Sequence, residues 1–234
     1  MKGRRNITTT RKGVNAKASV GNRTSARATF ESIVLPAPTL FGGSLAAALK
    51  KRQTIRSFSD RRLSQQMLSN LLWSACGVNR KSGPFGVPGI TAASASNSQE
   101  IDVYVTLEKG VYLYDAGSHS LKPIAAGDMR KLALGERQGP TGSNAAVRLI
   151  FVVDIEKYKK AGFQEPGLWD AEVQKSYYYA DTGLIAGNVY LFAASQGLGA
   201  WFHNCNRSEL ASRLGLGKNQ RVLFGQTVGY SEND

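Results

Sequence analysis

The sequence is poor in the residues from which metal centres and disulfide frameworks are built. It contains two cysteines, Cys76 and Cys205, and two histidines, His119 and His203. Two thiols form neither a disulfide framework nor a zinc site, and no spaced cluster of Cys, His and Asp accompanies them. We therefore interpret both cysteines as reduced and partly buried, and we expect no metal centre.

Long apolar runs are also missing, as are acidic residues near the N-terminus. No stretch approaches the ~18 uninterrupted apolar residues of a spanning helix, so no membrane partner is expected. The formal net charge is +13, but residues 1–30 hold eight bases and no acid, whereas the remainder has 22 bases and 17 acids. The basic character is thus largely a property of the N-terminal segment, which argues against nucleic acid as the partner of the whole chain.

Residues 1–30 are predicted to form a disordered basic tail ahead of a domain that spans residues 31–234. High charge and few large apolar side chains leave this segment little surface to bury. Its layout is that of a twin-arginine export signal, but bases interrupt the apolar run that such a signal needs. We expect a cytoplasmic protein, and export is the alternative if the tail is a degraded or altered signal. The residues behind this interpretation are Arg4, Arg5, Arg11, Lys12, Asn15 and Lys17.

Hydrophobic periodicity and capping residues predict helices and strands that do not alternate regularly. This order predicts an α+β fold rather than a doubly wound sheet. The longest helical pattern, 169–196, is apolar on nearly all sides, which predicts that it lies buried at the centre of a homodimer. Helices are expected at 44–52 (capped by Ser44), 65–76 (capped by Ser64), 127–134, 169–196 and 208–214, strands at 101–107, 111–115, 147–154, 201–205 and 221–230, and a loop at 77–89.

The common catalytic and nucleotide-binding motifs do not occur. The sequence has no Gly-x-Ser-x-Gly nucleophile elbow and no P-loop. The Gly197-Leu198-Gly199 run has Phe202 where a dinucleotide fingerprint has its third glycine, and it follows a helix rather than a strand. The side chains therefore give no direct indication of acid–base or nucleophilic catalysis.

A basic segment at 51–58 suits a phosphorylated ligand. Arg52 and Arg56 are four residues apart, and Gln53 and Thr54 lie between them. Two guanidinium forks and short polar side chains can surround a phosphate or the polar edge of a ring. The alternative is a solvated basic end of a helix.

Two further segments suit a flat ligand. In 91–99, small residues let the backbone approach closely, and the amides of Asn97 and Gln99 can both donate and accept hydrogen bonds. In 181–199, glycines within the helical pattern indicate close approach of a ligand or another helix, while the last two end the helix. The alternatives are a polar loop and a closely packed helix.

Taken together and in this order, these segments resemble the nitroreductase family over roughly residues 35–230. Within the family the likeness is to the SagB-type branch, which is related to thiazoline and oxazoline dehydrogenases. The resemblance implies a nitroreductase-like fold, with a central, mostly antiparallel sheet flanked by helices and FMN held at the interface of a homodimer. The matching stretches are 35–38, 44–45, 52–58, 71–77, 94–99 and 228–230.

The resemblance also assigns cofactor-binding residues. The first segment would hold the phosphate, ribityl chain and pyrimidine side of FMN, the second would reach the flavin from the partner subunit, and the third would place its backbone near the reactive flavin nitrogen. These residues are Arg52, Gln53, Thr54 and Arg56, then Ser94, Ala95, Ser96, Asn97 and Gln99, and then Gly199, Phe202, His203 and Asn204.

Two departures from the family pattern bear on activity. Many members carry a basic residue near the C-terminus that binds the phosphate, and no base follows Arg221 here. Azoline dehydrogenases tend to have a Lys–Tyr pair ahead of the long helix. The nearest equivalents, Lys175 and Tyr177, are separated by Ser176. This departure argues against azoline oxidation.

The expected function is that of an FMN-dependent oxidoreductase. NAD(P)H would give a hydride to the flavin, and a nitroaromatic, quinone or similar small acceptor would then take the electrons in the same pocket. The flavin carries the chemistry, so no catalytic side chain is expected beyond the candidates Lys175 and Tyr177. Two alternatives stay open, namely an FMN-dependent azoline dehydrogenase of peptide substrates that passes electrons to oxygen, and a non-catalytic flavin- or peptide-binding module.

Overall fold

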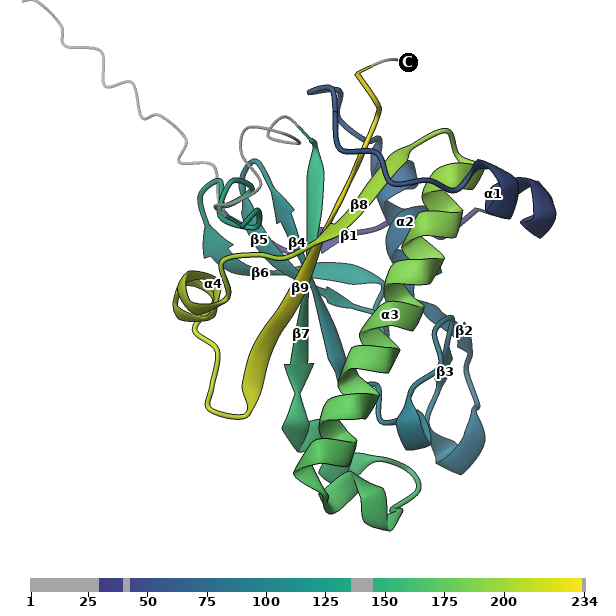
Figure 1. Ribbon diagram of the computed structural model, residues 1–234, viewed down its shortest axis with the longest axis vertical. Helices are drawn as coiled ribbons and strands as arrows, with labels where there is room; N and C mark the ends of the chain where they lie inside the picture. The colour runs from purple at the N-terminus through teal and green to yellow at the C-terminus, as the bar shows by residue number, and fades with distance from the viewer. Residues whose placement is uncertain (1–29, 40–42, 136–144, 233–234) are drawn as a thin grey trace, which may run out of the picture.

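A computed structural model describes residues 30–39, 43–135 and 145–232 of the chain. At its centre is a seven-stranded sheet in the order β1-β6-β5-β4-β7-β9-β8, in which every neighbouring pair is antiparallel (Figure 1). The expected α+β fold, with a central antiparallel sheet flanked by helices, is therefore confirmed. The strands are β1 (Ile33–Val34), β4 (Ile101–Leu107), β5 (Gly110–Asp115), β6 (Ser120–Ala126), β7 (Val147–Asp154), β8 (Gly199–His203) and β9 (Gln220–Gly229).

In the described part of the chain, four α-helices pack around the sheet, and capping side chains mark where three of them begin. The Ser44 and Ser64 hydroxyls accept hydrogen bonds from Ala47 N and Met67 N, which begins α1 and α2 where the sequence predicted. Asp170 caps the long helix through Glu172 N and Val173 N. The helices are α1 (Leu45–Lys51), α2 (Gln65–Cys76), α3 (Ala171–Ser195) and α4 (Arg207–Arg213).

The centre of the sheet is covered on both faces. Along β7, Leu149 and Phe151 pack into the core beneath α2 and α3, whereas Ile150 and Val152 pack on the opposite face with Leu210 of α4. Figure 1 shows α2 and α3 on one side of the sheet and α4 on the other. A strand buried on both faces reads as a continuous apolar run, which is why 147–154 could be recognised from sequence. Within the described residues, no helix is long and apolar enough to cross a membrane.

Two predictions of local structure were wrong, and one strand was missed. Residues 127–134 form turns rather than a helix, with the Ala133 N to Met129 O hydrogen bond closing one turn. The expected loop at 77–89 contains β2 (Val78–Arg80) and the 3-10 turn η1 (Pro84–Gly86), and β2 pairs with β3 (Gly89–Ile90). Strand β6 was missed, and it contains Pro123. A bulge in β6 lies next to this proline, where Ile124 has no partner on β5.

Three further 3-10 turns connect the main elements. Turn η2 (Ala95–Asn97) lies between β3 and β4, and turns η4 (Ile155–Lys160) and η5 (Pro166–Trp169) lead from β7 to α3. Residues 1–29 lie outside the described part of the chain, so the disordered tail remains a prediction.

Candidate functional site

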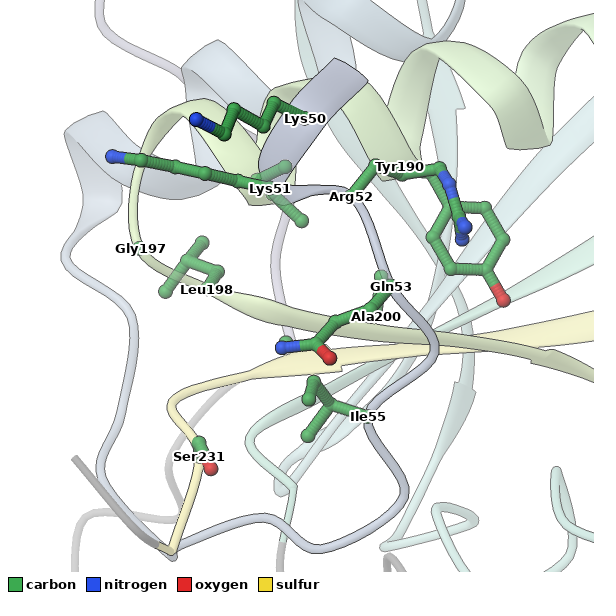
Figure 2. Close-up of a pocket in the computed structure, with 13 residues that line it drawn as sticks. Lys50, Lys51, Arg52, Gln53, Ile55, Tyr190, Gly197, Leu198, Ala200 and Ser231 are labelled. Carbon is green, nitrogen blue, oxygen red and sulfur yellow. The ribbon is translucent and has the colours of Figure 1, made fainter. Parts of the chain in front are cut away.

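A cavity of about 670 Å³ lies where the end of α1, the segment after it, the C-terminal end of α3 and the start of β8 meet (Figure 2). Of the predicted site residues, it brings together Arg52, Gln53 and Gly199. Small residues form much of its wall, which leaves backbone accessible to a flat ligand. The lining residues are Lys50, Lys51, Arg52, Gln53, Ile55, Tyr190, Ala193, Ala194, Gly197, Leu198, Gly199, Ala200 and Ser231.

The cavity is positively charged. Lys50, Lys51 and Arg52 are consecutive at the end of α1, and no acid is among the lining residues. No salt bridge between described residues involves these three cations. Cations are favourable at a helix C-terminus, where carbonyl groups concentrate partial negative charge. That helix end offsets part of their mutual repulsion, and an anion placed among them would offset more.

The segment after α1 is held against the edge strand β8. Thr54 forms a parallel bridge with Ala200, and Ile55 N donates to Ala200 O at 3.0 Å. Gly199 has no room for a side chain, because an added Cβ would lie 2.9 Å from the Ile55 side chain. The backbone of residues 52–55 is therefore fixed along one wall of the cavity.

Tyr190 of α3 joins the first and third predicted segments. Its hydroxyl accepts a hydrogen bond from Phe202 N at 2.9 Å and lies 3.2 Å from Thr54 Oγ1. The Arg52 guanidinium lies over the Tyr190 ring, 5.6 Å from its centroid, as Figure 2 shows. Tyr190 thus fixes both the backbone of the site and the direction of its arginine.

The other five predicted residues of these two segments lie outside the cavity lining, namely Thr54, Arg56, Phe202, His203 and Asn204. Arg56 turns away and lies over the Trp201 ring, 5.6 Å from its centroid. Phe202 packs against Phe151 and Phe224. His203 is buried between Asn204 O, 2.7 Å from its Nδ1, and the Thr227 hydroxyl, 2.8 Å from its Nε2. Burial lowers the pKa of His203 to about 4, so its ring is neutral near pH 7.

The loop 94–99 contacts α3 far from the cavity. Ala95 N donates to the Asp181 carboxylate at 2.9 Å. Asp181 precedes Ala193, which lines the cavity, by 12 residues along the helix, or about 18 Å at the rise of an α-helix. No residue of 94–99 lines the cavity of its own chain. If this loop contacts a ligand in such a cavity, the cavity belongs to another copy of the chain.

The catalytic candidates Lys175 and Tyr177 lie near the start of α3, further still from the cavity. Lys175 lies 3.7 Å from Glu172 in an exposed ion pair. A hydrogen bond with Glu165 raises the pKa of the Tyr177 hydroxyl. Neither residue lines this cavity or either of two smaller cavities in the described part of the chain.

Both cysteines are buried and free, as the sequence suggested. Burial raises the pKa of Cys76 to about 12 and that of Cys205 to about 11, so both stay as thiols near neutral pH. Among the described residues no group of His, Cys, Asp and Glu is arranged to hold a metal ion.

Sequence reasoning missed Lys50, Tyr190 and Ser231, and it did not select Lys51 from within the basic segment 51–58. Lys50 adjoins that segment, and the charge of both lysines was a usable signal. The other two reach the cavity only through tertiary folding, since Tyr190 is 136 residues from its partner Thr54.

The sequence of this chain is similar to that of known proteins. Residues 49–230 match the family model described as "Nitroreductase family". The chain is 30% identical over 166 residues to "Putative nitroreductase MJ1384" of Methanocaldococcus jannaschii, an alignment that covers 66% of this chain and 75% of that protein.

Solved structures agree with this match. The crystal structure of a "putative nitroreductase" from Ralstonia eutropha has a TM-score of 0.73 and 31% identity, with 94% of this chain and 96% of that one covered. The Vibrio harveyi NADPH:FMN oxidoreductase complexed with NAD⁺ has a TM-score of 0.56 and 18% identity, with 80% of this chain and 69% of that one covered. The Escherichia coli microcin synthetase McbBCD complex has a TM-score of 0.61 and 17% identity, with 82% of this chain and 74% of that one covered. Both of these likenesses concern the fold alone.

Proposed function

Because this chain belongs to the nitroreductase family, we propose that it is an FMN-dependent oxidoreductase that transfers hydride from NAD(P)H to a nitroaromatic, quinone or similar small acceptor. Membership of the family indicates a flavin-dependent oxidoreductase in general. Three finer points are our proposal, namely that the flavin is FMN, that NAD(P)H is the electron donor, and that the acceptor is a nitroaromatic, quinone or similar small molecule.

One observation carries the choice of FMN, namely the cavity in which three cations meet and no lining residue is acidic. FMN has a dianionic phosphate at one end and a flat ring system at the other. Lys50, Lys51 and Arg52 would bind the phosphate, and the small residues near Gly199 would lie along the ring system. The Gln53 side chain points into the cavity beside Ala200, where its amide can pair with a polar ring edge (Figure 2).

A bound flavin supplies the hydride chemistry, so the protein needs to bind, orient and shield. Tyr190 and Thr54 would hold the wall of the cavity rigid through the hydroxyl contact described above. The positive charge of Lys50, Lys51 and Arg52 would also favour an anionic form of the bound ligand over its neutral form. This arrangement accounts for a site that lacks a titrating catalytic side chain.

We propose further that the protein works as a homodimer in which α3 faces its counterpart. Tyr179 and Leu184 of α3 are 42% and 49% exposed. Gly183 and Gly187 have open space where a side chain would stand. A second copy packed here would bury this face, and would let the loop 94–99 of one chain approach the cavity of the other.

Purified protein tests the function directly. We expect a flavin absorption spectrum, release of FMN on denaturation, and anaerobic bleaching by NADH or NADPH followed by reoxidation with a nitroaromatic or quinone. Apo-protein that takes up no added FMN would contradict the proposal. Flavin that NAD(P)H does not bleach would indicate the non-catalytic module, and flavin reduced by a peptide azoline instead would indicate the dehydrogenase.

A further inference from the structure

The loop 94–99 is held in an unfavourable backbone conformation. Ser96, Asn97 and Gln99 have φ angles of 50°, 54° and 50°, in the left-handed region that residues other than glycine seldom occupy. Asparagine tolerates this region better than serine or glutamine does. Three such residues within four positions persist only where the surroundings enforce them.

Hydrogen bonds from several elements enforce this shape. Gln99 N donates to Ser94 Oγ at 3.0 Å, and Gln99 Nε2 donates to Pro88 O at 2.7 Å. Lys157 Nζ donates to Gln99 O at 3.1 Å. All three involve Gln99, at the end of the loop. Near the start of the loop, Ala95 N donates to Asp181 Oδ2, which ties the backbone to α3.

Asp181 is itself held in an unusual environment. It is 6% exposed, and it lies beside Glu100, which is completely buried and accepts a hydrogen bond from Ser98 Oγ at 2.6 Å. Burial, followed by the charge of Glu100, raises the pKa of Asp181 to about 7, while the bond from Ala95 N opposes the shift. Two neighbouring buried carboxyl groups favour holding one proton between them.

Other groups around Asp181 and Glu100 do not neutralise them. Lys157, which donates to Gln99 O, is already paired with Asp102 at 2.6 Å. Burial and then the charge of Glu100 raise the pKa of Tyr158, so its hydroxyl stays neutral. The titratable groups that sense the charge of Asp181 are Tyr158 of η4 and Tyr177 of α3.

We propose that Asp181 is a positioning residue, which fixes the strained loop 94–99 in the shape that reaches the cofactor of a second chain. Its carboxyl oxygen orients the loop through the hydrogen bond from Ala95 N. The destination of the loop rests on the proposed function, whereas the anchoring of the loop does not.

Amide hydrogen exchange of residues 94–99 in flavin-free protein, followed by mass spectrometry, tests the anchoring. Asp181→Ala removes the acceptor, and exchange should become at least about tenfold faster. Asp181→Asn keeps an oxygen acceptor of the same shape, so exchange should stay near that of the wild type. Glu172→Gln is the matched control on an exposed carboxylate of the same helix, and should change nothing. Wild-type exchange in Asp181→Ala would overturn the proposal.

Thermal unfolding against pH tests the burial of Asp181 beside Glu100. The pKa of Asp181 is raised in the folded protein, so its protonated form is the stable one, and stability is lost as pH rises from about 4 to about 7. Asp181→Asn and wild type should therefore unfold alike near pH 4. The variant should gain on the order of 5 °C by pH 7 and keep that advantage above it. A difference that does not vary with pH would overturn this placement of Asp181.

The FMN dissociation constant tests the destination of the loop. Asp181→Ala should weaken FMN binding about tenfold, while Asp181→Asn should remain near wild type. Faster exchange with unchanged FMN affinity would overturn the link to the cofactor while leaving FMN binding itself intact. Failure of the wild-type protein to bind FMN would instead contradict the proposed function, and the exchange result would still stand.

Discussion

Arg52→Ala should weaken FMN binding much more than riboflavin binding, because the two ligands differ only in the phosphate. The Arg52 guanidinium lines the cavity with Lys50 and Lys51, and its direction is set by the Tyr190 ring. A hydrogen bond to a charged group contributes about 1.5–3 kcal/mol. This range corresponds to a loss of roughly 10- to 100-fold in FMN affinity.

The fold should survive this change. Arg52 is exposed, it forms no salt bridge with a described residue, and exposed charges contribute little to stability. We therefore expect the thermal midpoint of the apo-protein to remain within a few degrees of the wild type, which separates loss of a ligand contact from loss of the site.

Titration of apo-protein with FMN and with riboflavin measures the effect. Lys109→Ala, in the exposed turn between β4 and β5, removes the same charge far from the cavity and is the matched control. Arg56→Ala discriminates between two assignments. The family resemblance places Arg56 at the cofactor, whereas here it lies over Trp201 and outside the cavity lining, so its loss should matter less than that of Arg52. Equal losses of FMN and riboflavin in Arg52→Ala would refute the phosphate assignment.

Three other outcomes are expected. Gly187→Arg fills open space on α3, so the monomer should fold but lose both dimerisation and FMN, and light scattering would then report 25.3 kDa rather than twice that mass. A dimeric, yellow Gly187→Arg variant would contradict the α3 interface. The pKa of His203 is lowered by burial from 6.5 to about 4, so its contribution, roughly 3 kcal/mol, is present above pH 6.5 and lost as pH falls through 4. Denaturant titrations of wild type and His203→Gln between pH 4 and 7 should diverge accordingly, and parallel curves would refute this reading. Deleting residues 1–29, which keeps Phe30 and its ring contact with Tyr112, should leave the thermal midpoint and flavin content nearly unchanged, and a large loss of either would show that the tail packs on the domain.

Local sequence rules accounted for much of the fold. Helices α1 and α2 begin at serine caps, and strand β7 is an apolar run bounded by polar residues, so each carries its own signal. Strand β6 carries none, because its pattern is interrupted by Pro123 and by the bulge at Ile124. The turns at 127–134 were mistaken for a helix because their apolar spacing reflects packing against the sheet, with Ala133 and Leu132 in the core beneath α4.

In the candidate site, too, some residues could be selected from local sequence and others could not. Arg52 and Gln53 could be selected because they lie in one short basic segment next to a helix end. Tyr190 could not, since its role depends on contacts with Thr54 and Phe202 that arise when α3 packs beside β8. The third segment was assigned as one stretch, yet the cavity meets only the start of β8. Gly199 and Ala200 line the cavity, while His203, at the other end of the strand, is buried beside Thr227.

The position of β8 at the end of the sheet has a consequence for handling the protein. Beyond β8, the bridge from Thr54 to Ala200 and the bond from Ile55 N are what cover its outer edge. An uncovered edge strand is a template for pairing with other chains and hence for aggregation. A ligand that holds residues 52–55 in place therefore also shields this edge. Stripping the cofactor should thus shorten the time for which concentrated protein stays in solution, and adding it back should restore that time.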